Sequence, residues 1–422
     1  AELFQAKRSP AMRRRSPRMR RQSPLQILSA DWLTAKSTST VIEALEAARP
    51  DCARFVGGCV RNAIMGRPVD DIDIATQLRP EDTLKALEAA SIRAIPTGID
   101  HGTVTAVVDG EPFEITSLRR DVETDGRRAV VAFTDDWAED AQRRDFRFNA
   151  LYAAPNGELF DPVGGGYADA ESGRVVFIGD ADQRLREDYL RILRFFRFNA
   201  WYGARIDAEG LAACKRQRDG LSKIARERIW KELKKLLAAP RPRLALQAMG
   251  ESGVLDAVLA EHRGIETLHD LELTEQLTRV QPDSMLRLMA LLPRSALAVQ
   301  QTQDALRLSN EDSNRLTMWA ADNLPDPVGM KSQALRATLY WHGKQAVVDR
   351  AMLAGADVRD LLAAIRAWKR PDFPIGGDDA LAAGLEGREI GQALSRVAQI
   401  WVDSDFDLGR EDLLDLLVQD QD

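Results

Sequence analysis

Cysteine and histidine are scarce in this chain of 422 residues. The three cysteines form no Cys-x-x-Cys pair and the four histidines are scattered, so the sequence offers neither a disulfide framework nor a Cys/His zinc site. We therefore expect no zinc, and we expect a reducing compartment, the cytoplasm. The residues concerned are Cys52, Cys59, Cys214, His101, His262, His269 and His342.

Long apolar runs are also absent, although 45% of the residues are hydrophobic and 29% are charged. Charged residues interrupt every apolar run before it reaches the ~20 residues that a membrane-spanning helix needs, so we expect no membrane association. The formal net charge of −7 excludes a uniformly basic surface that coats nucleic acid. Any RNA partner must therefore bind a local basic face of a chain long enough for roughly two to four domains.

Residues 1–24 differ in composition from the rest of the chain. Lysines and arginines stand there among Ser and Pro, with almost no acidic residue and no apolar periodicity. This composition predicts a disordered basic arm. Three interpretations remain open: an artefact of the start site, an arm that touches RNA, and an Arg-rich targeting peptide.

Two kinds of pattern divide the remainder of the chain. From about residue 25 to 160, strand-like runs alternate with helical stretches and Gly-containing turns. Beyond about residue 175, nearly everything has helical period. The predicted fold class is α+β, with a small mixed sheet followed by an all-helical extension. The expected strands are 53–56, 71–75, 102–108 and 112–117, and the clearest expected helices are 182–201, 224–237, 244–259 and 284–292.

The segment Asp71-Ile72-Asp73-Ile74 carries the first chemical signal. Because side chains alternate along a strand, both aspartates are expected on one face, ~7 Å apart, with the isoleucines in the core. Mg²⁺ prefers oxygen ligands and completes its shell with water or phosphate, so this pair indicates nucleotide chemistry. A bare pair of this kind is usually an exposed strand end, and the surrounding motifs favour the metal site.

A Gly57-Gly58 pair stands about 13 residues before these aspartates, ahead of a helix expected to start near Val60. Glycines let the backbone approach a phosphate, and a helix start with Arg61 adds N–H donors and positive charge. A third carboxylate, Glu114, is expected on an adjacent strand, where it would complete a three-carboxylate cluster. Two metal ions in such a cluster would activate a 3′-hydroxyl and hold a triphosphate.

Four sequence blocks follow one another between roughly residues 50 and 240. They are Gly57-Gly58-Cys59-Val60-Arg61-Asn62, Asp71-Ile72-Asp73, Arg143-Arg144-Asp145-Phe146 and Glu187-Asp188-Tyr189-Leu190-Arg191. In this order they resemble the class II tRNA nucleotidyltransferases, or CCA-adding enzymes, and the similar bacterial poly(A) polymerases. The resemblance implies a template-independent enzyme that uses Mg²⁺ and adds C, C and A from CTP and ATP to the 3′ end of tRNA.

The resemblance also implies a division of the chain and roles for the residues of the blocks. A catalytic head would occupy 25–172, a helical neck that reads the base 173–238, and a helical body and tail that hold tRNA 239–422. The metal ligands would be Asp71 and Asp73. The nucleotide-binding residues would be Gly57, Gly58, Arg61, Arg144, Asp145, Asp188, Arg191, Arg194 and Arg197, with Asp145 on the ribose. The family usually has Asp where Asn62 stands, which affects the helix start and none of the metal ligands.

Asp188 and Arg191 are three residues apart on the expected helix 182–201 and would share a face. Cytosine and adenine present an amino donor beside a ring-nitrogen acceptor, whereas uracil and guanine present a carbonyl beside an N–H. A carboxylate beside a guanidinium matches the donor and acceptor arrangement of cytosine and adenine and does not match that of uracil and guanine. The alternative is an ordinary surface ion pair. Arg194 and Arg197 turn away from Asp188 by about 60° per step, so we expect them to bind phosphate or brace the pocket.

Three further segments carry weaker signals. Residues 116–134 are expected to form a loop, either a plain solvated loop or one that moves between C and A addition. His101 is expected in a turn or at a strand end. Glu227 and Arg228 either orient the neck pair from a second helix or pair at its surface.

Other functions share part of this pattern. A poly(A) polymerase, or an enzyme that adds only A, would show the same motifs, and the acidic end of this chain favours CCA addition. An inactive RNA-binding relative would not need intact carboxylates, and a small-molecule nucleotidyltransferase would not need the base-reading pair. The sequence leaves open the oligomeric state and the residues that contact tRNA.

Overall fold

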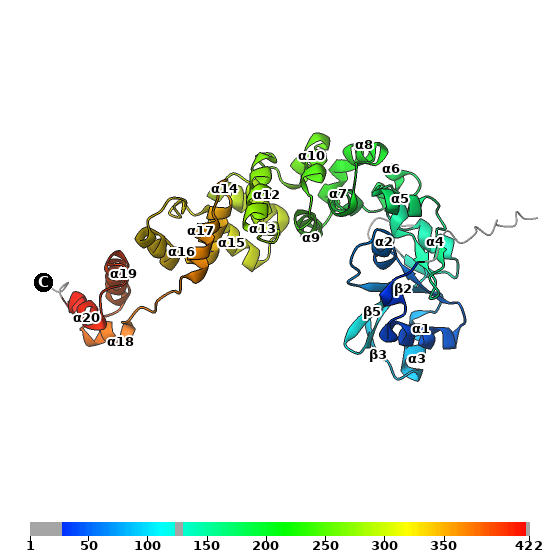
Figure 1. Cartoon of the computed structure of the whole chain (residues 1–422), viewed down its shortest axis with the longest axis horizontal. Helices are drawn as coiled ribbons and strands as arrows, with labels where there is room; N and C mark the ends of the chain where they lie inside the picture. Colours follow the sequence, from blue (N-terminus) through cyan, green and yellow to red (C-terminus); the bar gives the residue numbers. More distant parts are fainter. Residues whose placement is uncertain (1–27, 123–129, 419–422) are drawn as a thin grey trace, which may run out of the picture. The chain divides into compact units, whose positions relative to one another are not determined.

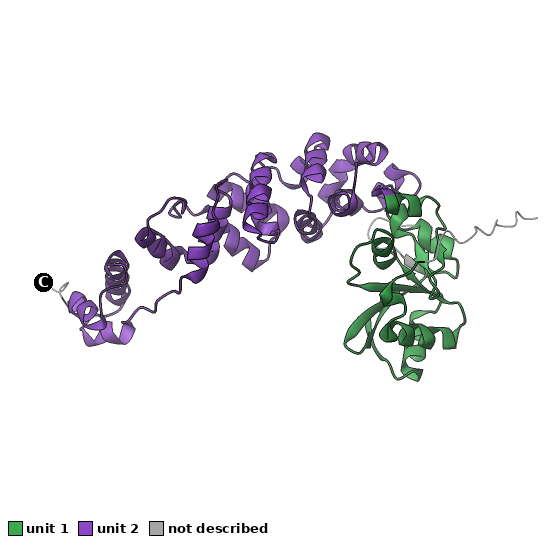
Figure 2. Cartoon of the chain, viewed as in Figure 1, with its two compact units in different colours: residues 1–171 green, residues 172–422 purple. Residues whose placement is uncertain are grey.

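The computed structural model describes residues 28–122 and 130–418, so the predicted basic arm, 1–24, lies outside the described residues. The chain divides into two compact units after Glu171 (Figure 2). The first unit contains the sheet and the second is helical, which confirms the predicted α+β class. Among the described residues, no helix is long and apolar enough to cross a membrane.

Seven strands form the main sheet of the first unit, in the order β3-β4-β5-β2-β1-β8-β9 (Figure 1). Neighbouring strands run antiparallel except β2 and β5, which are parallel. The four strands expected from the sequence are β1, β2, β4 and β5, while β3, β8 and β9 were not expected. Their bounds are β1 Ala53–Val56, β2 Ile72–Thr76, β3 Arg93–Gly98, β4 Thr103–Val108, β5 Glu111–Ser117, β8 Tyr152–Ala153 and β9 Leu159–Phe160.

The parallel pair β2 and β5 places two of the predicted carboxylates side by side, because Asp73 is the register partner of Glu114. Glu114 is exposed while its neighbours Phe113 and Ile115 are buried, as alternation along a strand requires. Asp71 lies just before the first residue of β2 and is exposed. The strand thus begins one residue later than expected, and the shared face of Asp71 and Asp73 stays a prediction.

Helices cover the sheet and lead into its site. Helices α1 and α3 pack against each other and against β4, and α2 packs against β1 and β2. The short helix α2 thus begins beside the strand that carries Asp73. The helix bounds in this unit are α1 Lys36–Ala48, α2 Gly58–Ile64, α3 Pro80–Ala89, α4 Trp137–Gln142 and α5 Gly166–Ser172, whose last residue lies beyond the division.

Residues 116–134 are not simply a loop. They contain β6 (Arg119–Val122) and β7 (Val130–Phe133), which pair as an antiparallel hairpin, and the part between these strands lies outside the described residues. Arg119 donates from Nη1 to the carbonyl of His101 at 2.8 Å. His101 ends a short 3-10 helix, which confirms its predicted position in a turn.

The described part of the second unit consists of helices and their connections. Two expected helices are each broken in two. The expected helix 182–201 is interrupted at Asp188, which has an extended backbone and accepts a hydrogen bond from the N–H of Leu190. The expected helix 244–259 is interrupted at Gly253, whose φ of 73° ends the first half in a left-handed residue. The helices are α6 Ala181–Glu187, α7 Leu190–Tyr202, α8 Ala208–Gln217, α9 Arg226–Leu237, α10 Arg243–Ser252, α11 Val254–Val258, α12 Glu266–Thr278, α13 Ser284–Leu291, α14 Ala296–Leu306, α15 Asn310–Ala320, α16 Ser332–Met352, α17 Arg359–Ala367, α18 Gly377–Ala382, α19 Arg388–Asp403 and α20 Arg410–Val418.

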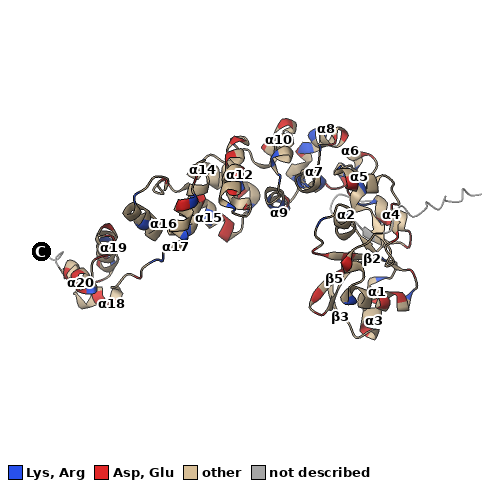
Figure 3. Ribbon diagram, in the orientation of Figure 1, with Lys and Arg blue, Asp and Glu red and all other residues tan. Residues whose placement is uncertain are grey.

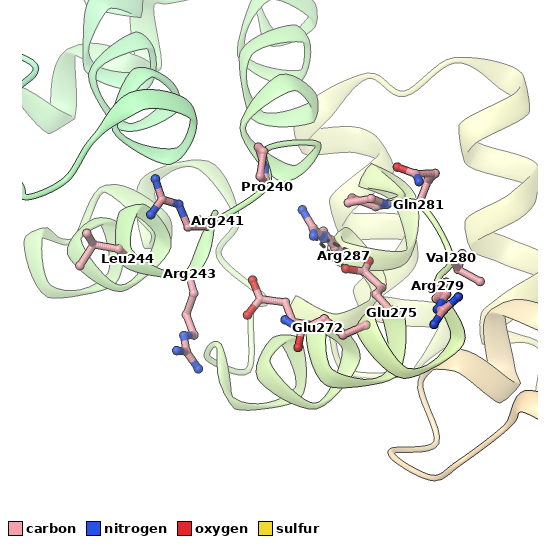
Figure 4. A pocket seen from close by; sticks show the side chains of 12 residues that line it. Pro240, Arg241, Arg243, Leu244, Glu272, Glu275, Arg279, Val280, Gln281 and Arg287 are labelled. Carbon is pink, nitrogen blue, oxygen red and sulfur yellow. Dashed lines mark hydrogen bonds and ion pairs between the residues drawn. The ribbon is translucent and has the colours of Figure 1, made fainter. Parts of the chain in front are cut away.

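A buried guanidinium fastens the end of α9 to the following helices. Arg287 of α13 is 2% exposed, and its Nη2 lies 2.8 Å from Glu275 Oε2 of α12. Its Nη1 donates to the carbonyls of Leu237 and Ala239, where α9 leaves carbonyls without helical partners. Figure 4 shows Arg287 and Glu275 in the lining of a cavity of about 540 Å³ that α10, α12 and the loop before α13 enclose.

A second contact fastens the middle of α9 to α15. Asp312 accepts hydrogen bonds from Lys234 Nζ at 2.9 Å and from Trp230 Nε1 at 3.2 Å. Acidic and basic residues are interspersed along the helices of this unit (Figure 3). Since α9 also packs against α7, it joins the neck segment to the helices that follow.

Candidate active site

The chain passes from β1 into α2 through Gly57 and Gly58. Gly57 has a φ of 72°, a conformation that L side chains rarely adopt. A Cβ atom on Gly57 would lie 3.6 Å from Nη1 of Arg144, and one on Gly58 would lie 4.0 Å from Oδ2 of Asp73. The turn therefore lies between a guanidinium and a carboxylate, and α2 begins at Gly58 rather than near Val60.

Arg61 is buried behind this turn, with 5% of its surface exposed. Its Nη1 donates to Asn149 Oδ1 at 2.6 Å, and its Nη2 donates to Asn62 Oδ1 at 2.8 Å. Asn149 donates in turn to Asp145 Oδ1 at 3.0 Å. Asn149, which the sequence analysis did not single out, thus links two motif residues. Asn62, the departure from the family pattern, serves as a hydrogen-bond acceptor for Arg61.

Asp73 lies near both carboxylates and arginines. Burial raises its pKa most, the carboxylates of Glu114 and Asp71 raise it further, and Arg144 and Arg61 lower it. The resulting pKa is about 6. Burial and the neighbouring carboxylates thus outweigh the two arginines, and a cation at Asp73 would favour the ionised carboxylate.

The carboxylate oxygens of this region are suitable ligands for a divalent cation. The protein supplies only part of the coordination shell. Within residues 28–122 and 130–418, no three His, Cys, Asp or Glu side chains are grouped closely enough to hold a metal ion. The expected three-carboxylate cluster is thus not closed among these residues, although Glu114 and Asp71 both lie near enough to Asp73 to raise its pKa. Hard cations such as Mg²⁺ take carboxylate oxygens and fill the remaining positions with phosphate and water.

Asp140, which the sequence analysis missed, holds Arg144 beside the glycine turn. Asp140 is 1% exposed, and its Oδ2 accepts hydrogen bonds from Arg144 Nη2 at 3.0 Å and from the Tyr152 hydroxyl at 2.7 Å. Burial alone would raise its pKa, but Arg144, Arg143 and these hydrogen bonds outweigh burial and lower the pKa to about 2. The carboxylate therefore stays ionised and orients Arg144. Its position four residues before Arg144 is the sequence signal that could have identified it.

Asp188 lies in the break between α6 and α7. Its Oδ1 accepts from the N–H of Leu190, and its Oδ2 accepts from Arg228 Nη2, both at 3.0 Å. Arg228 belongs to α9, so the expected contact from a second helix is present. Glu227 does not share it, because its carboxylate accepts from Arg307 Nη1 at 2.9 Å.

Arg191 lies on α7 and is held by the end of α6. Its Nη1 donates to Glu187 Oε2 at 2.6 Å and to the carbonyl of Arg184 at 2.8 Å. The prediction that Asp188 and Arg191 share one helix face was wrong, because the chain changes direction at Asp188. Each residue is instead oriented by its own partner, Asp188 by Arg228 and Arg191 by Glu187.

The two following arginines of α7 lie against Phe198. The guanidinium carbons of Arg197 and Arg194 are 4.1 and 5.4 Å from the centroid of that ring. Arg197 also pairs with Glu232 of α9, with 2.6 Å between Nε and Oε2, and both side chains are largely buried. Arg197 therefore joins α7 to α9, and the expected roles of Arg194 and Arg197, binding phosphate or bracing the pocket, stay predictions.

Comparisons with known proteins agree with this geometry. Residues 53–176 match the model of the poly A polymerase head domain, and residues 203–266 match that of the probable RNA and SrmB-binding site of polymerase A. Over 382 residues the chain is 33% identical to CCA tRNA nucleotidyltransferase 1, mitochondrial, of Danio rerio, and the match covers 87% of each chain. This chain belongs to the CCA tRNA nucleotidyltransferase family. The resemblance seen in the four sequence blocks is thereby confirmed.

Other members of the family extend the match. A CCA-adding enzyme of Streptococcus pyogenes is 42% identical over 199 residues, which cover 47% of this chain and 48% of that one. The crystal structure of the Bacillus stearothermophilus CCA-adding enzyme in complex with CTP superposes with a TM-score of 0.73 at 25% identity, covering 91% of this chain and 97% of that one. The helical unit, in which the sequence pattern fitted the family only loosely, is thus largely included in the match.

Proposed function

We propose that this family member adds C, C and A from CTP and ATP to the 3′ end of tRNA without a template. The RNA 3′-hydroxyl attacks the α-phosphate of the bound nucleotide, and pyrophosphate leaves. The observation that carries this proposal is the convergence of the Gly57-Gly58 turn, Asp73 and Arg144, with Asp73 in register with Glu114. The relatives that support it are CCA-adding enzymes by name.

The glycine turn and two arginines bind the triphosphate in this proposal. Gly57 and Gly58 have no side chains to exclude a phosphate, and Nη1 of Arg144 lies beside Gly57. Arg61, held by Asn149, adds fixed positive charge behind the turn. Because these groups are already oriented, little reorganisation is needed when the nucleotide binds. Asp145 is assigned to the ribose.

The carboxylates are the proposed site for Mg²⁺. Asp71 and Asp73 would hold it, and Glu114, paired in register with Asp73, is the third catalytic carboxylate. When bound, the cation lowers the pKa of the attacking hydroxyl and stabilises the charge of the triphosphate. The raised pKa of Asp73 fits this assignment, because a cation would compensate for the neighbouring carboxylates.

Asp188 and Arg191 are the proposed base readers. Asp188 accepts a hydrogen bond from the amino group that cytosine and adenine share, and Arg191 donates to the adjacent ring nitrogen. Arg228 and Glu187 hold the two groups in place. Arg194 and Arg197 complete the nucleotide pocket by bracing or phosphate contact. The neck, body and tail, assigned to 173–238 and 239–422, would hold the tRNA.

We also propose a reducing compartment, the cytoplasm, for this protein. All three cysteines are buried and free, and burial raises the pKa of the Cys52, Cys59 and Cys214 thiols. Thiols of this kind are typical of proteins kept in reduced form. The Danio rerio relative named above is mitochondrial by name, so locating the tagged full-length protein in cell fractions is the test.

Sequencing the products tests the activity. A tRNA that lacks its 3′-terminal CCA is incubated with the protein, Mg²⁺, CTP and ATP, and its 3′ ends are sequenced. We expect CCA and then termination. Omitting Mg²⁺ in the presence of a chelator should stop the reaction, and adding Mg²⁺ back should restore it.

A poly(A) polymerase is the alternative that one observation favours, because the matching family models carry that description. Such an enzyme would append a run of A residues and would not require CTP. A single A, added only to a tRNA that already ends in CC, would identify an A-adding enzyme. Failure to incorporate either nucleotide would identify an inactive RNA-binding relative.

A further inference from the structure

Three consecutive residues in the first turn of α9 contact two different parts of the second unit. Arg228 donates from Nη2 to Asp188 Oδ2 at 3.0 Å. Glu227 pairs with Arg307 at 2.9 Å, and Arg226 donates to the carbonyl of Asp304 at the end of α14. One helical turn thus contacts the neck with one side chain and the body with two.

The carboxylate of Asp188 needs such support because no helix includes its residue. Its backbone is extended, between the end of α6 and the start of α7. The terminal torsion of an aspartate has broad preferences, so hydrogen bonds must orient the two oxygens. The N–H of Leu190 engages Oδ1 and Arg228 engages Oδ2, and the side chain remains 34% exposed and accessible to a ligand.

The same turn also contacts the end of α14. Arg307 follows the last residue of α14 with a φ of 48°, a left-handed position at which glycine is the usual residue. Its side chain reaches Glu227, which is adjacent to Arg228 in the first turn of α9. Because this pair is largely exposed, it adds modest support to a turn whose main position is set by the packing of α9 against α7.

We propose that Arg228 is a positioning residue for nucleotide selection, and that Arg307 supports it from the body by holding the first turn of α9. Arg228 orients Asp188 so that its free lone pairs accept the amino hydrogen of cytosine or adenine. This inference rests on the proposed role of Asp188 as a base reader. The choice of nucleotide then depends on Arg228 and Arg307, neither of which touches the base.

The test measures single-turnover incorporation of CTP and UTP by the full-length enzyme, on a tRNA that lacks its 3′-terminal CCA. In Arg228→Ala, the preference for CTP over UTP should fall roughly three- to tenfold, the value of one ordinary hydrogen bond, because the contact is partly exposed. The KM for CTP should rise while the rate at saturating CTP changes less, because the contact acts on binding. Arg228→Lys should retain most of the preference, since it restores a cation opposite Asp188.

Arg307→Ala should lower the preference in the same direction by about threefold or less, as expected for an exposed pair. Arg216→Ala is the matched control, because it removes an exposed ion pair between α8 and Asp182 of α6 without touching Asp188. This control should keep the wild-type preference. Thermal melting of each variant separates loss of selection from loss of folded protein.

Asp188→Ala, alone and combined with Arg228→Ala, separates this inference from the function on which it rests. If Asp188→Ala keeps the CTP preference, the proposed base reading is wrong. If Asp188→Ala loses the preference and Arg228→Ala keeps it, base reading stands and the positioning role of Arg228 is overturned. If Arg228→Ala causes further loss in the Asp188→Ala background, Arg228 acts through another residue and the proposal is also overturned. An unchanged preference in Arg307→Ala would refute the support from the body.

Discussion

The proposed catalytic carboxylate and the proposed base-reading pair are held in different ways. Asp73 is set opposite Glu114 by the backbone register of β2 and β5, and the hydrogen bonds of the surrounding strands reinforce that register. Asp188 and Arg191 are set by side-chain ion pairs at a break between helices. Ion pairs with exposed members typically contribute ~0.2 to 1 kcal/mol, so they exchange partners readily. The difference suits a rigid catalytic site and an adjustable site that accepts first C and then A.

The largest effect is expected at the rigid site. Asp73→Ala should lower incorporation on the order of 1,000-fold or more, because it removes a metal ligand worth several kcal/mol in the transition state. The fold should persist, since Asp73 is only partly buried and is not among the core residues. Single-turnover incorporation and thermal melting measure the two properties.

Glu88→Ala, at an exposed carboxylate of α3, is the control. Near-normal transfer by Asp73→Ala in Mg²⁺ would refute the metal assignment, and Asp71→Ala tests the second ligand in the same way.

A pH-dependent loss of stability is expected at Asp140 in the same unit. Its pKa in the folded state, about 2, lies below its ordinary value of 3.8, so its contribution is present above pH 4 and is lost as the pH falls toward 2. The difference in pKa corresponds to about 2 kcal/mol. Asp140→Asn should therefore unfold more easily than the wild type at pH 7, and the gap should shrink below pH 4. Denaturant unfolding at pH 7, 4 and 3 measures it, and a gap that does not change with pH would contradict the assignment.

A smaller effect, and one of a different kind, is expected at the adjustable site. Arg191→Ala should reduce discrimination against UTP and GTP by up to a few tens of fold, because its guanidinium always donates and cannot match the N–H of uracil or guanine. Incorporation of each of the four nucleotides in single-turnover reactions measures it. Arg186→Ala, at an exposed arginine of α6, is the control. If Arg191→Ala slows all four nucleotides equally, Arg191 is structural.

The smallest effects are expected from two glycines of α10, which perturb the helical unit without touching either site. Gly253 has a φ of 73°, so Gly253→Ala should cost about 1 kcal/mol of unfolding free energy. Gly250 lies within the helix, and a Cβ there would meet no atom within 4 Å, so Gly250→Ala should stabilise by about 0.5 to 1 kcal/mol. Denaturant unfolding measures both. A change in transfer by either variant at a temperature where it is fully folded would show that the sites are not independent of this helix.

Sequence patterns predicted the part of the site that depends on local structure. Strand alternation correctly placed Glu114 between two buried neighbours, and the Gly57-Gly58 pair does form a turn with a positive φ. The strand starts one residue later than expected, so the shared face of Asp71 and Asp73 stays a prediction. The expected helix 182–201 is broken in two because periodicity does not reveal a single extended residue. That residue is Asp188, whose side chain accepts a hydrogen bond from the N–H of Leu190 at the start of the next helix.

Long-range partners could not be predicted from these patterns. Asn149 reaches Arg61, and Arg228 reaches Asp188, only because the fold brings separate elements together. Local spacing offered a signal only for Asp140, which stands four residues before Arg144. Partner choice between helices depends on side-chain direction and packing, which a single sequence does not report.

The parallel pairing of β2 and β5 has a consequence for the order of folding. Strands β3, β4 and β5 join neighbours in sequence, whereas Asp73 meets Glu114 only after the chain has closed a loop around β3 and β4. Strand β1 can pair early with its sequence neighbour β2, but the pairing of β1 with β8 must wait longer, because Val56 pairs with Tyr152. Closing such loops costs entropy before any contact repays it, so distant pairings form late. In pulse-labelled hydrogen exchange during refolding, we expect the amides of β4 to be protected before those of β8, so that the pairings around the proposed catalytic centre are among the last in the sheet to form.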